Sequence, residues 1–172
     1  MEKTVKIAGL FLRKNKLLLT LRFVTENLEA KADCDRINKM TEKELKKFLT
    51  LGETETVEFK ESLSEGFYKT VSAFANTRGG VILLGIDNKN KIKGIDPSTK
   101  FLEDLTNSII NKLSIYPEIE ITNIYRKQII AVKVIYSGPL VSYKGHYYER
   151  IGNTTREISK DKLRNLLSKG KS

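Results

Sequence analysis

The stretch that decides the fold is Gly52-Glu53-Thr54-Glu55-Thr56-Val57-Glu58-Phe59-Lys60. Val57 and Phe59 alternate with Glu58 and Lys60, which predicts a half-buried strand with polar side chains on its other face. Glu53 and Glu58 would face opposite sides of one regular strand, so they converge only if Glu53 lies in the preceding loop. Gly52 makes such a loop plausible.

A second informative stretch, residues 73–87, reads Ala-Phe-Ala-Asn-Thr-Arg-Gly-Gly-Val-Ile-Leu-Leu-Gly-Ile-Asp. Ser64 is expected to cap a helix that runs to about Asn76 and buries one apolar side. The residues expected on that side are Phe67, Val71, Phe74 and Ala75. Residues 81–86 are apolar on both faces, which predicts a central strand that ends at Asp87. Gly79-Gly80 fits a glycine that ends the helix better than a phosphate-binding loop.

The flanking segments complete an α+β domain. We expect a short strand over 91–95 after the turn at Asp87, a helix over about 99–113, strands over about 119–126 and 128–136 that turn at Arg126-Lys127, and a hairpin over 143–151. A last helix follows Ser159. Upstream, residues 4–12 and 17–25 predict a hairpin, and Thr41 with Glu44 predicts a capping box. Residues 1–47 are therefore interpreted as a hairpin and helix extension, and residues 48–172 as the main domain, a mixed sheet with helices packed on it.

The charge of the chain favours a polyanionic partner. Its 172 residues carry a formal net charge of +10, which is typical of proteins that bind nucleic acid. The single cysteine rules out an internal disulfide, and no apolar run is long enough to span a membrane. No signal-peptide pattern is present, so we expect a cytoplasmic protein.

The acidic side chains in this basic chain have two interpretations. Glu53, Glu58 and Asp87 would surround one divalent cation if the two predicted strands are neighbours, with Lys60 steadying a phosphate. Alternatively, the acids are solvated and Glu58 forms only a surface ion pair with Lys60, which contributes about 0–1 kcal/mol.

The chain resembles the Schlafen family, more specifically its prokaryotic Schlafen-like, Alba-type branch. The resemblance is carried by the two stretches quoted above and by a third, residues 147–156, which reads Tyr-Tyr-Glu-Arg-Ile-Gly-Asn-Thr-Thr-Arg. It covers about residues 48–168, with the three motifs in the expected order. It implies a single lobe of the Schlafen core, whereas the vertebrate core has two related lobes, so we expect a homodimer.

The resemblance also implies chemistry. In nuclease-active Schlafen proteins, the matching positions are catalytic carboxylates, which here are Glu53, Glu58 and Asp87, and Lys60 matches the motif lysine. The implied activity is a Mg²⁺- or Mn²⁺-dependent endoribonuclease that cleaves structured RNA such as tRNA. Many prokaryotic relatives are instead regarded as DNA binders, so a non-catalytic DNA-binding module, such as a transcriptional regulator or chromatin-like factor, is the alternative.

Several basic and aromatic residues are candidates for contact with nucleic acid. Basic side chains near the proposed site or at hairpin tips suit phosphates, and tyrosines among them suit unpaired bases, although each type is also common on ordinary surfaces. The candidates are Arg78, Lys89, Lys91, Lys93, Arg126, Lys127, Lys144, Tyr148, Arg150 and Arg156.

Overall fold

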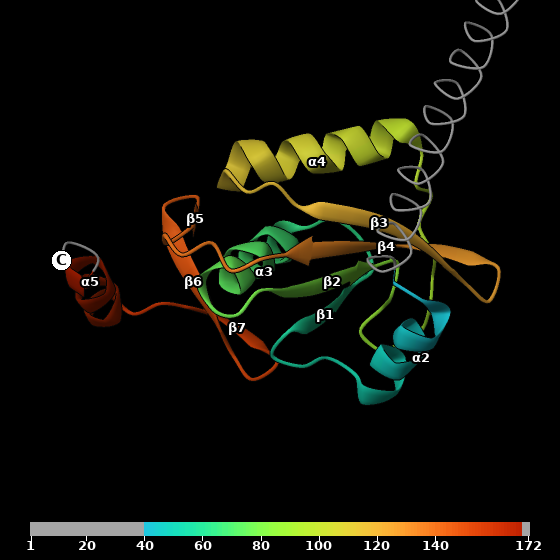
Figure 1. The fold of residues 1–172 in the computed structure, drawn as a ribbon, viewed down its shortest axis with the longest axis horizontal. Helices are drawn as coiled ribbons and strands as arrows, with labels where there is room; N and C mark the ends of the chain where they lie inside the picture. Colours follow the sequence, from blue (N-terminus) through green and yellow to red (C-terminus); the bar gives the residue numbers. More distant parts are fainter. Residues whose placement is uncertain (1–39, 170–172) are drawn as a thin grey trace, which may run out of the picture. The chain divides into compact units, whose positions relative to one another are not determined.

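The computed structural model describes residues 40–169, and Figure 1 shows their arrangement. Within this range the structure has four helices and seven strands, which confirms the predicted α+β class. In chain order the elements are α2 (Glu42–Leu51), β1 (Val57–Lys60), α3 (Glu65–Asn76), β2 (Gly80–Leu84), α4 (Thr99–Leu113), β3 (Glu118–Ile124), β4 (Lys127–Val134), β5 (Ser142–Tyr143), β6 (His146–Ile151), β7 (Thr154–Glu157) and α5 (Lys160–Lys169).

The contacts divide the chain into two compact units, Met1–Lys39 and Met40–Ser172. The second unit includes the whole of α2, and the division expected between residues 47 and 48 stays a prediction. The predicted hairpin over residues 4–25 lies outside the described residues. At the start of α2 the predicted capping box is confirmed, because Thr41 Oγ1 accepts the Glu44 N–H and the Glu44 carboxylate accepts the Thr41 N–H.

The main sheet has the strand order β1-β2-β4-β3. Strands β1 and β2 are parallel, since α3 carries the chain back between them, and the other two pairs are antiparallel. β2 is a central strand, as predicted. β1 lies at the edge, with Glu58 opposite Ile82 and Lys60 opposite Leu84.

Helices cover both faces of this sheet. One core cluster joins α3 and α4 to the face of the sheet that carries Ile82, Leu84, Ile130 and Val132. The other joins α2 to the opposite face, which carries Val57, Phe59, Leu83 and Ala131. The four residues predicted on the buried side of α3 are all buried. Val57 and Phe59 of β1 therefore pack in the core beside α2, whereas Glu58, between them, lies on the face that carries the other core.

A second, antiparallel sheet of order β5-β6-β7 packs against α3. Asn76, the last residue of α3, joins the two parts. Its Nδ2 donates to the carbonyls of Val141 and Tyr148, each at 2.9 Å, and its Oδ1 accepts the Val141 N–H at 2.7 Å. Gly79, at φ 74°, donates its N–H to Phe74 O, which confirms that this glycine ends the helix.

Two details differ from the prediction. The β3–β4 turn is formed by Tyr125 and Arg126, not by Arg126 and Lys127, because Ile124 pairs with Lys127. The predicted strand after Asp87 is reduced to one bridge between Ile86 and Ile92. Both differences lie at the end of the sheet near α2, where two turns pack together.

Candidate nucleic-acid interface

A buried ion pair links the small sheet to β1. Arg150 on β6 and Glu58 on β1 are 3% and 6% exposed, and Arg150 Nη1 donates to Glu58 Oε2 at 2.8 Å. The guanidinium also donates to Thr155 Oγ1 at 3.0 Å and to the Thr54 carbonyl at 2.7 Å, and it lies over the ring of Phe74. Arg150 was a candidate for phosphate contact, but here its charge is used inside the fold.

The second Glu58 oxygen is also occupied. Lys60 lies on the same face of β1 by the strand period of two, and its ammonium donates to Glu58 Oε1. The prediction of a half-buried β1 with polar side chains on its other face needs correction in one respect, because Arg150 of β6 covers Glu58 and the glutamate is buried. Two cations from different elements thus neutralise this carboxylate.

Glu53 lies in the loop before β1, as the sequence predicts. Its Oε1 accepts the Phe59 N–H at 3.0 Å. Because β1 is an edge strand, the side chain of Glu53 satisfies a backbone donor that no neighbouring strand reaches. Glu53 and Glu58 are therefore brought to the same short strand, but both oxygens of Glu58 and one oxygen of Glu53 have protein partners.

Asp87 lies in the turn after β2, close to the end of β1, since Ile86 N donates to Lys60 O at 3.2 Å. Lys60 and Leu84 are the last paired residues of β1 and β2, and Asp87 follows them in a turn. Its Oδ1 accepts the N–H groups of Lys89 and Lys91, both at 2.9 Å. Within residues 40–169 no group of three or more His, Cys, Asp or Glu residues is placed to hold a metal ion. The three predicted carboxylates do not form such a group here, so the metal site stays a prediction and no chemical step is derived through it.

The hydrogen bonds of Asp87 in this turn predict how the stability of the protein depends on pH. The pKa of Asp87 is lowered, first by the Lys91 N–H, although burial opposes the shift, and also by the Lys89 N–H and Lys93. Because the pKa of Asp87 is lower in the folded state, its ionised carboxylate stabilises the fold at pH values above the ordinary pKa of 3.8. This stabilisation is lost as the pH falls through the folded-state pKa. Asp87→Asn should therefore be less stable than the wild type at neutral pH.

The difference between Asp87→Asn and the wild type should shrink as the pH falls from 3.8 through the lowered folded-state pKa of Asp87, because both side chains are uncharged only below that value. Urea unfolding at several pH values measures this directly. A difference that stays constant down to acid pH would contradict the charged role of Asp87, and Asp96→Asn, at an exposed carboxylate, is the matched control.

The same turn packs beside the β3–β4 hairpin, which brings two basic segments together. Lys127 Nζ donates to Ile92 O at 2.9 Å, and Ile95 N donates to Gln128 O at 2.8 Å. A Cβ added at Gly94 would lie only 3.3 Å from the Cβ of Lys127, so the two segments are in close contact. We call the exposed residues gathered here the basic end: Lys46 of α2, Lys89, Lys91, Lys93, Arg126 and Lys127.

The cations of the basic end differ in their partners. Lys46 pairs with Glu42 at 2.8 Å, and Lys93 lies 3.5 Å from Asp87. Lys89, Lys91 and Arg126 form no ion pair with any residue in the range 40–169. Three of the predicted candidates are therefore exposed on two segments that contact each other, and their charges are free to bind an anion.

Tyr125, which the sequence analysis did not select, also lies at the basic end. Its side chain is 68% exposed, and Lys46 Nζ lies 5.5 Å from its ring centroid. The expected turn at Arg126-Lys127 placed Tyr125 inside a strand and so concealed it. The pairing of Ile124 with Lys127 puts it at the tip.

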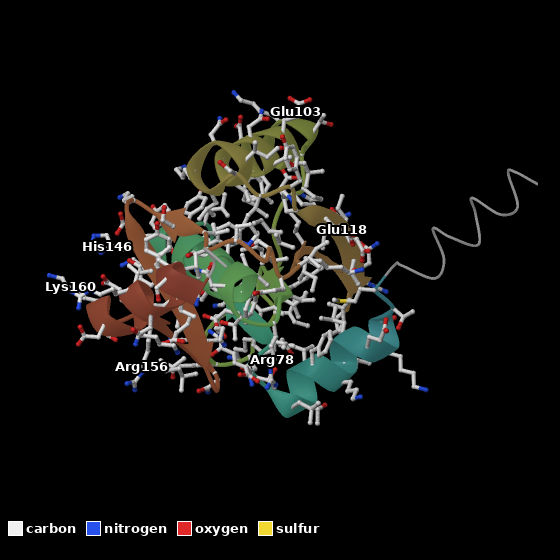
Figure 2. The ribbon with its side chains drawn as sticks, turned by 60° about the vertical axis from the view of Figure 1, so that its left-hand side comes forward. Arg78, Glu103, Glu118, His146, Arg156 and Lys160 are labelled. Atoms are coloured by element: carbon white, nitrogen blue, oxygen red, sulfur yellow. The ribbon has the colours of Figure 1, made fainter. Side chains whose placement is uncertain are left out.

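The remaining candidates lie elsewhere. Tyr148 is 9% exposed and belongs to the core. Arg78 pairs with Glu55 at 2.9 Å, and Lys144 pairs with Glu65. Arg156 is exposed on β7, and Figure 2 shows it on the same lower side of the view as Arg78. The structure therefore does not gather these residues at the basic end.

The comparisons with known proteins agree with the predicted family. Residues 53–159, more than half of the chain, match the family described as Schlafen, AlbA_2. The chain belongs to this family, and membership indicates a nucleic-acid-related function. A search of curated proteins found no match. None of the helices within residues 40–169 is long and apolar enough to cross a membrane.

A search of solved structures found chains that are similar to this one at low sequence identity. The DIP2311 protein from Corynebacterium diphtheriae is 18% identical with a TM-score of 0.52, and the match covers 60% of this chain and 25% of that protein. The N-terminal domain of the "Putative ATP-dependent DNA Helicase RecG-related Protein" from Nitrosomonas europaea is 22% identical with a TM-score of 0.47, covering 67% of this chain and 90% of that domain. The chain thus spans a quarter of the length of the Corynebacterium protein.

Proposed function

We propose that this domain binds nucleic acid and that the basic end contacts the phosphate backbone. The observation that carries the proposal is the convergence of two basic segments, residues 89–93 and 126–127, held together by the Lys127–Ile92 and Ile95–Gln128 hydrogen bonds. These two segments lie far apart in the sequence, and they form one charged surface only because they pack together. RNA with a tRNA-like structure is the first candidate ligand and DNA the second.

The physical basis is the release of counterions. Each Lys or Arg that neutralises a phosphate releases ions condensed on the nucleic acid, and affinity then falls with salt. Lys89, Lys91 and Arg126 can act in this way without breaking any ion pair formed among residues 40–169. Arg126 can in addition bind two phosphate oxygens at once, because its guanidinium donors are planar and paired.

The test is a titration of labelled hairpin RNA and of a matched hairpin DNA at several salt concentrations. Three phosphate contacts predict that log K falls against log salt with a slope of about −2 or steeper, at about −0.7 to −0.9 for each contact. Binding that is absent at low salt, or that does not change with salt, would overturn the proposal. The ratio of the RNA and DNA affinities decides between the two candidate ligands.

Cleavage is a second candidate function, because the family includes nucleases and because Glu53 and Glu58 come to the same strand. The observed partners of Glu58 do not favour it. The protein should be incubated with tRNA and Mg²⁺, Mn²⁺ or EDTA, together with Glu53→Gln, which keeps an oxygen acceptor for the Phe59 N–H. Metal-dependent fragments that disappear in this variant would support an endoribonuclease. Binding without cleavage in every condition would favour the non-catalytic module.

The homodimer expected from the two-lobed relatives is part of the same proposal. A second copy would place two basic ends in one particle and lengthen the surface available to a folded RNA. Sedimentation at the concentrations used for RNA binding measures the oligomeric state of the protein. A protein that binds RNA and stays a monomer at these concentrations would contradict the homodimer.

A further inference from the structure

The β3–β4 turn has an unusual residue at its tip. Tyr125 and Arg126 have φ values of 47° and 61°, in the left-handed region. A two-residue hairpin turn with both φ values positive strongly prefers Asn-Gly or Asp-Gly, because a Cβ is disfavoured there. Tyr-Arg is therefore a poor choice for the stability of this hairpin.

The burial of Tyr125 does not compensate for this conformation. Its side chain is 68% exposed, so an aromatic ring is held in water at the end of the molecule. In Figure 1 the turn projects beyond the ends of the other strands on the side where α2 lies. Backbone conformations of this kind persist most often where they serve a function.

The surroundings of the ring indicate which ligand it suits. Lys46 Nζ lies 5.5 Å from the ring centroid, and the two residues that follow Tyr125 are Arg126 and Lys127. Lys91 and Lys93 flank Ile92, whose carbonyl accepts from Lys127 Nζ at 2.9 Å. An exposed aromatic face among cations matches the combination that binds unpaired nucleotides, in which the ring stacks on a base and the cations contact the phosphates.

We propose that Tyr125 stacks on an unpaired base, so that the basic end prefers single-stranded or looped nucleic acid over a continuous duplex. This inference rests on the proposed function, since it names the form of nucleic acid that the same surface binds. In a duplex both faces of each base are covered by neighbouring bases, and the ring of Tyr125 has no face to contact. Contacts between the cations and phosphates are available in either form.

The test compares single-stranded oligonucleotides with duplexes of matched sequence, each as RNA and as DNA. Tyr125→Asn should weaken single-strand binding by about ten- to hundredfold, the effect of losing one base–aromatic stack. Duplex binding should change little. Because asparagine tolerates the left-handed region, the same variant should keep or raise the melting temperature, so that loss of binding cannot be attributed to unfolding.

Tyr125→Phe is the matched control, because it keeps the aromatic face and should retain single-strand affinity. The chain has no tryptophan, so tyrosine emission is directly measurable. A single strand should quench this emission less in Tyr125→Phe than in the wild type, even though both bind it, because the stacked ring is no longer a tyrosine.

Each outcome separates this inference from the proposed function. Salt-dependent binding of both forms that is unchanged in Tyr125→Asn would overturn the stacking and leave the phosphate surface intact. An equal loss for single strand and duplex would also overturn it, because the residue would then only shape the hairpin. If the wild type binds no nucleic acid, both proposals fail. A preference between the RNA and DNA single strands identifies the ligand.

Discussion

Arg150→Ala will lower the free energy of unfolding by about 3–5 kcal/mol, the range measured when one partner of a buried ion pair is removed. The substitution leaves the Glu58 carboxylate, 6% exposed, without its guanidinium partner. It also removes the donors to Thr54 O and Thr155 Oγ1. Because these partners lie on β1, on its preceding loop and on β7, the small sheet should separate from β1 first.

Urea unfolding followed by circular dichroism measures this effect. Arg156→Ala is the control, since Arg156 is an exposed arginine on the neighbouring strand and its loss should change stability by less than about 0.5 kcal/mol. Equal effects of the two substitutions would contradict the structural role assigned to Arg150.

Replacing both charged residues of the pair tests whether the loss of stability in Arg150→Ala arises from the unpaired carboxylate of Glu58. Glu58→Gln combined with Arg150→Met should be more stable than Arg150→Ala alone, because no isolated charge is then buried. The Arg150 Nε has no hydrogen-bond partner in the range 40–169, so the native pair is itself incompletely satisfied. A double variant as unstable as Arg150→Ala would show that packing against Phe74, and not charge, dominates.

Replacing Lys89, Lys91 and Arg126 together with glutamine will weaken binding of single-stranded RNA about 100-fold at 0.1 M salt, because three contacts of slope about −0.7 are lost. The slope of log K against log salt should become shallower by about 2. Stability should remain close to that of the wild type, since these exposed side chains form no ion pair within the described part of the chain.

The matched control also removes two lysines and one arginine, namely Lys100, Arg156 and Lys160, all exposed. Figure 2 shows Arg156 and Lys160 on the far side of the molecule from α2. This control has the same net charge as the first variant but an intact basic end, so its salt slope should stay near the wild-type value. Equal weakening by both variants would mean that net charge alone governs binding.

The elements were predictable where local signals agree. The spacing of Phe67, Val71 and Phe74 predicted the buried face of α3, and Thr41 with Glu44 predicted the start of α2. The apolar run before Asp87 predicted the central position of β2. These features depend on periodicity and capping within a few residues, which the sequence displays directly.

The site was less predictable because its contacts are long-range. Glu58 and Arg150 are 92 residues apart, and no local pattern shows that one covers the other. The packing of Lys127 against Ile92 is equally invisible in the sequence, although it creates the basic end. Tyr125 was missed because its neighbours Ile124 and Arg126 fit the strand expected over 119–126, whereas the pairing register shortens that strand.

The most direct test of the central claim is a backbone amide chemical-shift map of the full chain during titration with hairpin RNA. The largest shifts are expected at residues 89–93 and 125–127, with smaller changes around Lys46. Shifts confined to Arg78, Arg156 and their neighbours would place the nucleic acid on the other side of the molecule. That result would contradict the assignment of the basic end as the binding surface.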